Sequence, residues 1–86
     1  MVKPWEQQRV ILRNLLRQQR VDCGLTQAQL AVRMGKPQSF VSKIESGDRG
    51  LDFVEVRDYC QACGLTFTSL VDKFESALNQ LESDWR

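Results

Sequence analysis

Apolar residues recur along the chain at the spacing of an α-helix, in segments that glycine and proline separate. The first segment runs from about Pro4 to Asp22 and places Leu12, Leu15 and Leu16 on one face. Pro4 suits the first turn of a helix, where the backbone amide has no helical partner. No segment alternates polar and apolar residues as a half-buried strand does. The pattern therefore predicts an all-α protein.

Capping signals predict the next two helices. Thr26 and Gln29 have the spacing of a capping box, and Gly35 ends the helix that they begin. The third helix starts near Pro37, which takes its first helical position, and ends around Gly47. Two short helices joined by a tight turn that contains glycine have the layout of a helix-turn-helix unit.

The same kinds of signal predict two more helices in the second half of the chain. Asp52 and Glu55 form another capping pair, and Gly64 stops the helix that follows. Thr66 caps a last helix over about 67–85. We expect no internal repeat and no linker, so residues 1–86 suit a single domain. The apolar face of the fourth helix comprises Phe53, Val56, Tyr59, Cys60 and Cys63.

The third helix combines an apolar side with a polar arc. At about 100° per residue, Val41 and Ile44 group on one side, with Phe40 and Glu45 at its borders. Amides, hydroxyls and an ammonium group can pair with base edges and phosphates without repelling the DNA backbone. Taken alone, such an arc is more typical of an ordinary solvated helix face. The opposite arc has no carboxylate and consists of Gln38, Ser39, Ser42, Lys43 and Ser46.

The segment GLTQAQLAVRMGKPQSFVSKIESG, preceded by LRQQRVDC, resembles the phage-repressor (Cro/repressor-type, XRE) family of helix-turn-helix DNA-binding domains. The resemblance covers about residues 10–78, and the part from 16 to 47 follows the family pattern closely. It implies a five-helix lambda-repressor-like domain with an extended C-terminal helix and a helix-turn-helix core at about 26–46. It also implies that a recognition helix, residues 37–45, enters the major groove of double-stranded operator DNA.

The resemblance further implies roles for individual residues. Arg20 of the first helix pairs with Glu45 of the third, which locks the two helices together. Phe40 fits either a contact to DNA or a place at the edge of the core. The residues that lie where relatives touch bases or phosphates are Gln27, Lys36, Gln38, Ser39, Phe40, Ser42, Lys43 and Arg49.

The net charge of +1 hides a polarised chain. Residues 1–50 carry nine Lys and Arg against four Asp and Glu, whereas residues 51–86 carry three against seven. A basic end can hold a polyanion while an acidic end stays away from it. Asp48 and Gly50 stand where many relatives carry basic residues, so the resemblance implies a modest affinity for the DNA backbone.

The last helix carries an apolar seam with a spacing of three and four residues, typical of helices that pair with one another. Its second half extends past the minimal domain and has little core of its own to cover. We therefore expect a homodimer, with a monomeric cap or a grip on another protein as the alternatives. The expected seam consists of Phe74, Leu78, Leu81 and Trp85.

The three cysteines do not have the spacing and setting of a known metal or redox motif. An odd count without a secretion signal favours reduced thiols, and Cys60 and Cys63 fall inside a helix rather than at its start. A zinc site needs four ligands, and the chain offers three thiols and no histidine. We expect no metal and no cofactor, with Cys60 and Cys63 packed as small apolar side chains.

These observations predict a sequence-specific DNA-binding protein, a small repressor-like transcriptional regulator of the cytoplasm with no membrane contact. The absence of histidine, of a phosphate-binding glycine loop and of a paired-carboxylate motif argues against an enzyme. One alternative is an antitoxin or a restriction–modification controller with the same domain. Another is an adaptor whose last helix binds a protein partner, such as a toxin. The charge split and the carboxylate-free arc favour DNA, whereas the near-neutral total and Asp48 favour the adaptor.

Overall fold

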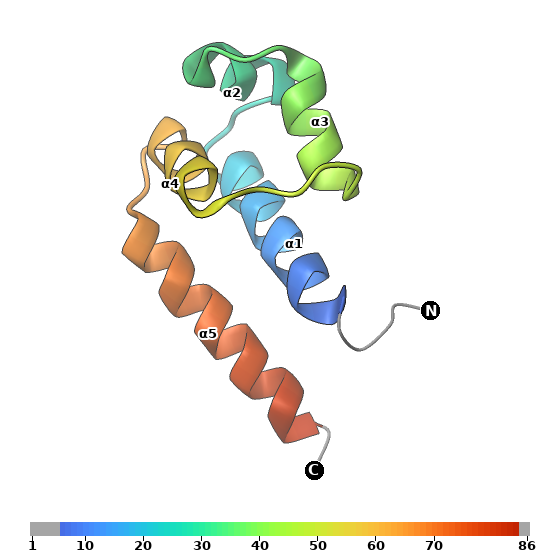
Figure 1. The fold of residues 1–86 in the computed structure, drawn as a ribbon. Helices are drawn as coiled ribbons and strands as arrows, with labels where there is room; N and C mark the ends of the chain where they lie inside the picture. Colours follow the sequence, from blue (N-terminus) through green and yellow to red (C-terminus); the bar gives the residue numbers. More distant parts are fainter. Residues whose placement is uncertain (1–5, 85–86) are drawn as a thin grey trace.

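The computed structural model describes residues 6–84 and contains the five helices that the sequence pattern predicts (Figure 1). The all-α prediction is therefore confirmed, and the described residues include no strand. Pro4, expected in the first turn, lies outside the described residues. The helices are α1 (Gln7–Asp22), α2 (Gln27–Met34), α3 (Gln38–Ser46), α4 (Phe53–Ala62) and α5 (Phe67–Asp84).

Helix α1 forms the centre of the arrangement, and α3, α4 and α5 all pack against it. Helices α2 and α3 lie together at one end of the molecule, while α5 runs along α1 towards the other end (Figure 1). Every helix contributes to the single hydrophobic core, which removes these side chains from water. The largest fully buried side chains are Tyr59, Leu16, Leu30, Leu70, Val41 and Cys60.

The predicted capping boxes set the starts of α2 and α4. The Thr26 hydroxyl accepts a hydrogen bond from the Gln29 amide, and the Gln29 side chain accepts one from the Thr26 amide. Asp52 and Glu55 make the same reciprocal pair. Local side chains thus satisfy amides that a helix leaves unpaired at its start.

Helix α3 starts one residue later than the sequence predicts. Pro37 has an extended backbone (φ −70°, ψ 156°) and occupies the N-cap position, so Gln38 is the first helical residue. The Pro37 carbonyl already accepts a hydrogen bond from the Phe40 amide, as an N-cap residue does. The proline therefore directs the chain into the helix from outside it.

A short internal repeat contradicts the expectation that the chain has none. Residues 23–26 and 63–66 share the sequence Cys-Gly-Leu-Thr, and they join α1 to α2 and α4 to α5. Gly24 and Gly64 have left-handed backbones, with φ of 75° and 73°. In both copies the leucine amide bonds a carbonyl oxygen five residues earlier, and the threonine hydroxyl caps the next helix. The same four residues thus build the same connector twice.

Phe53 differs from its expected place on the buried face of α4. It is 74% exposed, and its ring meets the Phe67 ring edge to face with 4.8 Å between centroids. Phe53 is the first residue of α4, and its ring meets the edge of the core through Phe67. Phe53 would be buried only if another segment of the chain packed over it. Helical periodicity in the sequence does not show whether such a segment is present.

Candidate nucleic-acid interface

A tight turn sets α3 against α2. Gly35 adopts a left-handed backbone with φ of 67°, and the Lys36 amide bonds the carbonyl oxygen of Ala31 at 2.9 Å. Ala31 is buried where the two helices meet, and its small side chain allows them to approach closely. The geometry is that of a helix-turn-helix unit, with α3 as the outer helix.

The polar arc of α3 faces solvent as one continuous surface. Val41 and Ile44 are buried on the inner side of the helix, as the sequence predicts. The structure brings together four exposed residues that the sequence assigns to DNA contact: Gln38, Ser39, Ser42 and Lys43. None of these four side chains is acidic, so the arc presents donors and acceptors with one positive charge.

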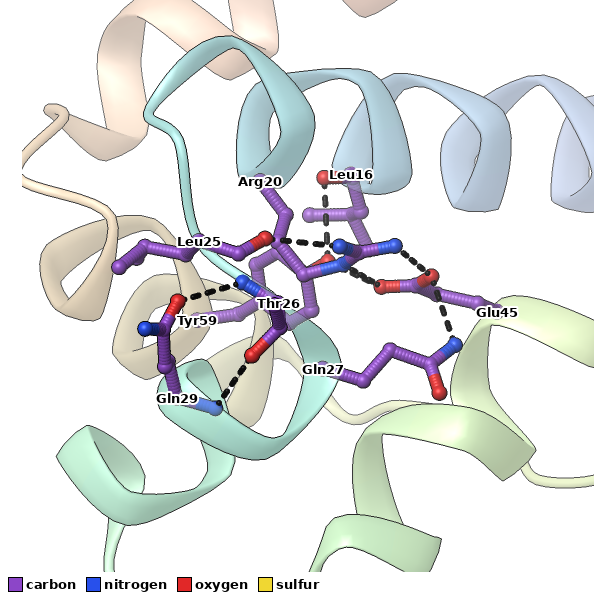
Figure 2. Close-up of polar contacts among 8 residues, drawn as sticks. All are labelled: Leu16, Arg20, Leu25, Thr26, Gln27, Gln29, Glu45 and Tyr59. Atoms are coloured by element: carbon purple, nitrogen blue, oxygen red, sulfur yellow. Dashed lines mark hydrogen bonds and ion pairs between the residues drawn. The ribbon is translucent and has the colours of Figure 1, made fainter.

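Beneath this arc, Glu45 is the centre of a polar network (Figure 2). The Arg20 guanidinium donates from Nε to Glu45 Oε2 at 2.7 Å and from Nη2 to Oε1 at 2.8 Å. Its third nitrogen, Nη1, donates to the backbone carbonyl of Leu25 at 2.8 Å. The two side chains are only 10% and 4% exposed. The two residues expected to pair thus form a bidentate, largely buried ion pair between α1 and α3.

Two further donors complete the network, and both come from other helices (Figure 2). Gln27 Nε2 donates to Glu45 Oε1 at 3.2 Å. The Tyr59 hydroxyl lies 2.9 Å from Glu45 Oε2 and 3.1 Å from the carbonyl oxygen of Leu16. Side chains of α1, α2 and α4 therefore converge on one carboxylate of α3.

The network shifts the protonation of its members. Burial alone would raise the pKa of Glu45, but the hydrogen bonds from Arg20, Gln27 and Tyr59 outweigh it and lower the pKa below the ordinary 4.5. The hydrogen bond to Glu45 raises the pKa of Arg20 in turn. Burial, followed by the nearby Glu45 charge, raises the pKa of Tyr59, so the phenol stays neutral. Glu45 therefore presents no uncompensated negative charge beneath the arc.

The sequence did not identify Tyr59 as part of this site. It marked the residue only as part of an apolar helix face, whereas the hydroxyl is the link between α4 and the ion pair. One signal was available, because a buried tyrosine usually places its hydroxyl on a polar partner. The identity of that partner depends on how the helices pack.

Gln27, expected to contact a phosphate, has a side chain that is already held in place within the protein. Its side-chain nitrogen is held by Glu45, and the residue is half-buried. It is also the first residue of α2, where backbone amides and the helix dipole favour an anion. The Glu45 contact therefore fixes the Gln27 side chain beside the start of the helix.

Phe40, which the sequence leaves between two roles, is buried in the core at 9% exposure. Two cations lie over its ring: Lys36 Nζ is 5.3 Å and Arg49 Cζ is 4.5 Å from the centroid. Arg49 also pairs with Glu55 at 2.8 Å, and this hydrogen bond lowers the pKa of Glu55. Phe40 thus supports two of the expected phosphate-binding residues from below, and Arg49 already has a carboxylate partner.

Arg13 of α1 lies against the C-terminal end of α3. Gly47, with φ of 86°, ends the helix, and a Cβ placed on it would lie 2.8 Å from Arg13 Cζ. The Arg13 guanidinium therefore packs against the last turn of α3, where the helix dipole favours a cation.

The expected dimer seam is partly covered within the monomer. Phe74, Leu78 and Leu81 are half-buried in the described part of the chain, where α5 packs along α1. Trp85 lies outside the described residues. Helix α1 lies beside α5 over part of its length, and the end of α5 extends past the start of α1 (Figure 1).

Residues 6–84 contain neither a metal-binding cluster nor a helix suited to span a membrane. No group of three or more Cys, Asp or Glu side chains has the geometry of a metal site in this range. None of the helices described here is long and apolar enough to cross a membrane.

The helix-turn-helix class that this geometry defines is also found in the sequence, because residues 11–74 match the family model of a helix-turn-helix domain. A solved XRE-family like protein from Pseudomonas syringae pv. tomato str. DC3000 is 40% identical to the chain, with a TM-score of 0.80 over 84% of this chain and 88% of that one. The chain therefore belongs to the XRE family of helix-turn-helix DNA-binding regulators.

Two more distant structures share the fold. The restriction-modification controller protein C.Esp1396I is 15% identical, with a TM-score of 0.77 over 83% of this chain and 91% of that one. The clp gene regulator ClgR from Corynebacterium glutamicum is 24% identical, with a TM-score of 0.74 over 91% and 85%. No curated protein sequence matches the chain.

Proposed function

We propose that the protein is a sequence-specific, repressor-like regulator that places α3 in the major groove of double-stranded DNA. The exposed arc of Gln38, Ser39, Ser42 and Lys43 carries this proposal, because it combines base-pairing groups with the absence of any carboxylate. Helix α2 then lies across the backbone with its first turn, at Gln27, towards a phosphate. Regulation follows from occupancy of the operator and requires no catalysis.

The chemistry of the arc suggests a division of labour among its residues. The Gln38 amide can bond an adenine edge in two places, and Lys43 can reach a guanine edge or a phosphate. Ser39 and Ser42 have short hydroxyls that both donate and accept. Lys36 and Arg49, which both lie over the Phe40 ring, supply positive charge beside this residue.

The test starts from a selection of tight-binding duplexes out of a random pool, followed by anisotropy titrations of the selected DNA at several salt concentrations. We expect a linear fall of log affinity with log salt, and we expect Lys43→Ala to lower the slope by about one unit. Lys73→Ala, the same change on the exposed face of α5, is the matched control and should leave the slope unaltered. A salt-independent affinity, or equal effects of the two substitutions, would contradict the proposal and favour an adaptor.

We further propose that the protein acts as a homodimer. The surface that supports this proposal is larger than the expected seam on α5 and includes the start of α4. Besides the expected seam of Phe74, Leu78 and Leu81, α4 and α5 expose Phe53 (74%) and Val71 (44%). They border an apolar hollow of about 200 Å³ lined by Leu12, Phe53, Val56, Phe67, Leu70, Val71 and Phe74. A second copy of the chain would cover this apolar surface.

Sedimentation equilibrium of Val71→Asp tests this surface. The substitution places a charge on an exposed position, so the monomer should stay folded while the dimer dissociates. Val32→Asp, at a 79% exposed position on α2, should leave the dimer intact. A wild-type protein that sediments as a monomer at tens of micromolar would contradict the dimer proposal.

A further inference from the structure

The two Cys-Gly-Leu-Thr connectors meet in space through their cysteines. Cys23 Sγ donates a hydrogen bond to the backbone carbonyl oxygen of Cys63 at 2.9 Å. Because a carbonyl oxygen lies about 2.4 Å from the Cα of its own residue, this sulfur is within about 5.5 Å of the Cys63 Cα. The exposed Cys23 thiol therefore lies directly beside the backbone of the residue that carries the second thiol.

The two thiols differ in access. Cys23 is exposed at the end of α1, whereas Cys63 is 5% exposed at the end of α4. Burial raises the pKa of the Cys63 thiol to about 12, and the neighbouring Cys23 thiol acts in the same direction. A solvent oxidant therefore reaches Cys23 first, with Cys63 behind it.

We propose that Cys23 and Cys63 form an oxidation-sensitive pair that closes to an intramolecular disulfide in the presence of a peroxide. The peroxide transfers one oxygen atom to the Cys23 thiol, which gives a sulfenic acid and, for hydrogen peroxide, one molecule of water. The Cys63 sulfur then attacks the Cys23 sulfur. The hydroxyl of the sulfenic acid leaves with the Cys63 proton as a second water. Two thiols thus lose two electrons to the peroxide.

Cys60 is a poorer partner, although it is near Cys63 in the sequence. It is completely buried, and its Sγ lies 3.7 Å from Gln19 Oε1 in the core. Burial raises its pKa as well. The described hydrogen bond of the Cys60 side chain therefore points into the core towards α1. The Cys23 thiol, in contrast, is the one that contacts the backbone of Cys63.

The bridge would enclose the helix-turn-helix unit. Residues 24–62 contain α2 and α3 together with α4, so the disulfide closes a loop of about 40 residues around them. Such a loop restricts the unfolded chain, and the melting temperature should rise by roughly ten degrees or more. The arc of α3 and the Glu45 network have no part in the bridge.

Peptide mapping of the full chain after hydrogen peroxide, with free thiols blocked by an alkylating agent, tests the pairing. Trypsin separates a peptide of residues 21–33, which contains Cys23, from one of residues 58–73, which contains Cys60 and Cys63. We expect these two peptides to be linked in the oxidised monomer and to separate after reduction. Cys60→Ala should keep the link, whereas Cys63→Ala should abolish it.

Two readouts identify the reacting residue and the consequence. In Cys63→Ala, which lacks the resolving thiol, a dimedone probe should label Cys23 as a sulfenic acid. Oxidation should raise the melting temperature of the wild type and leave that of Cys23→Ser unchanged. Cys23 is exposed, so this substitution leaves the core intact. Absence of the linked peptides, their persistence in Cys63→Ala, or a link only between two molecules would overturn the proposal.

Discussion

The polar groups on the two sides of α3 are in opposite environments. On the inner side, Glu45 takes hydrogen bonds from Arg20, Gln27 and Tyr59, and each donor comes from a different helix. On the outer side, Gln38 and Lys43 face solvent. One helix thus combines a buried side that ties the other helices together with an exposed polar side. Changes on the inner side should alter the stability of the protein, and changes on the outer side should alter its affinity for DNA.

The largest effect should come from Arg20→Ala, which leaves the Glu45 carboxylate buried without its cation. We expect the free energy of unfolding to fall by about 3 kcal/mol or more, measured by urea denaturation. The Arg20→Ala/Glu45→Ala double variant should recover part of this loss, because the stranded charge is then removed as well. Strictly additive losses in this cycle would mean that the pair does not couple α1 to α3.

Tyr59→Phe should have the next largest effect. The substitution keeps the ring in the core and removes only the hydroxyl that lies against Glu45 and the Leu16 carbonyl. We expect a loss of about 1–2 kcal/mol in the same urea experiment. In a Glu45→Gln background the loss should be smaller, since a neutral amide gains less from the hydroxyl than a carboxylate does. An unchanged urea midpoint would mean that the Tyr59 hydroxyl, and through it α4, adds nothing to the stability of the Glu45 network.

Acid should weaken the inner side without a mutation. The folded state holds the pKa of Glu45 below the ordinary 4.5, so the contribution of this group is complete above that pH. It is lost as the pH falls through the lower folded-state pKa, because the unfolded chain binds the proton more readily. Urea midpoints recorded from pH 6 downwards should show this loss, and Glu45→Gln should flatten the profile. An equally steep profile in that variant would assign the loss to other carboxyl groups.

The smallest effect on stability should come from the exposed Arg49–Glu55 pair, and here binding is the informative measurement. Glu55→Gln keeps a capping-box side chain at that position but releases Arg49 from its carboxylate. We expect little change in the urea midpoint and a higher affinity for the selected DNA at low salt, while Arg49→Ala should lower that affinity. If both variants bind like the wild type, Arg49 does not contact the backbone.

The helix boundaries were predictable because their causes are local. Thr26 and Asp52 begin helices with partners three residues away, and Gly35 needs only its own backbone freedom to end one. The Arg20–Glu45 pairing came from the family resemblance, since nothing in the spacing of 25 residues requires it. The burial of Val41 and the exposure of Ser42 were predictable because they depend only on the helical periodicity of α3.

What escaped prediction depends on packing between distant segments. The hydroxyl of Tyr59 reaches Glu45 only because α4 packs against α1 and α2, and Phe53 is exposed because no segment among the described residues covers the start of α4. The pairing of Arg49 with Glu55 likewise depends on the path of the chain between α3 and α4. The Cys-Gly-Leu-Thr repeat was legible in the sequence, but its two copies meet only in the folded molecule.

The end of α3 at Gly47 also fixes the length of the helix. The left-handed backbone disfavours any other residue there, and the Arg13 guanidinium fills the space that a side chain would need. The nine residues of α3 span about 13 Å along the helix axis. Together, Gly47 and the Arg13 guanidinium fix the residue at which α3 ends.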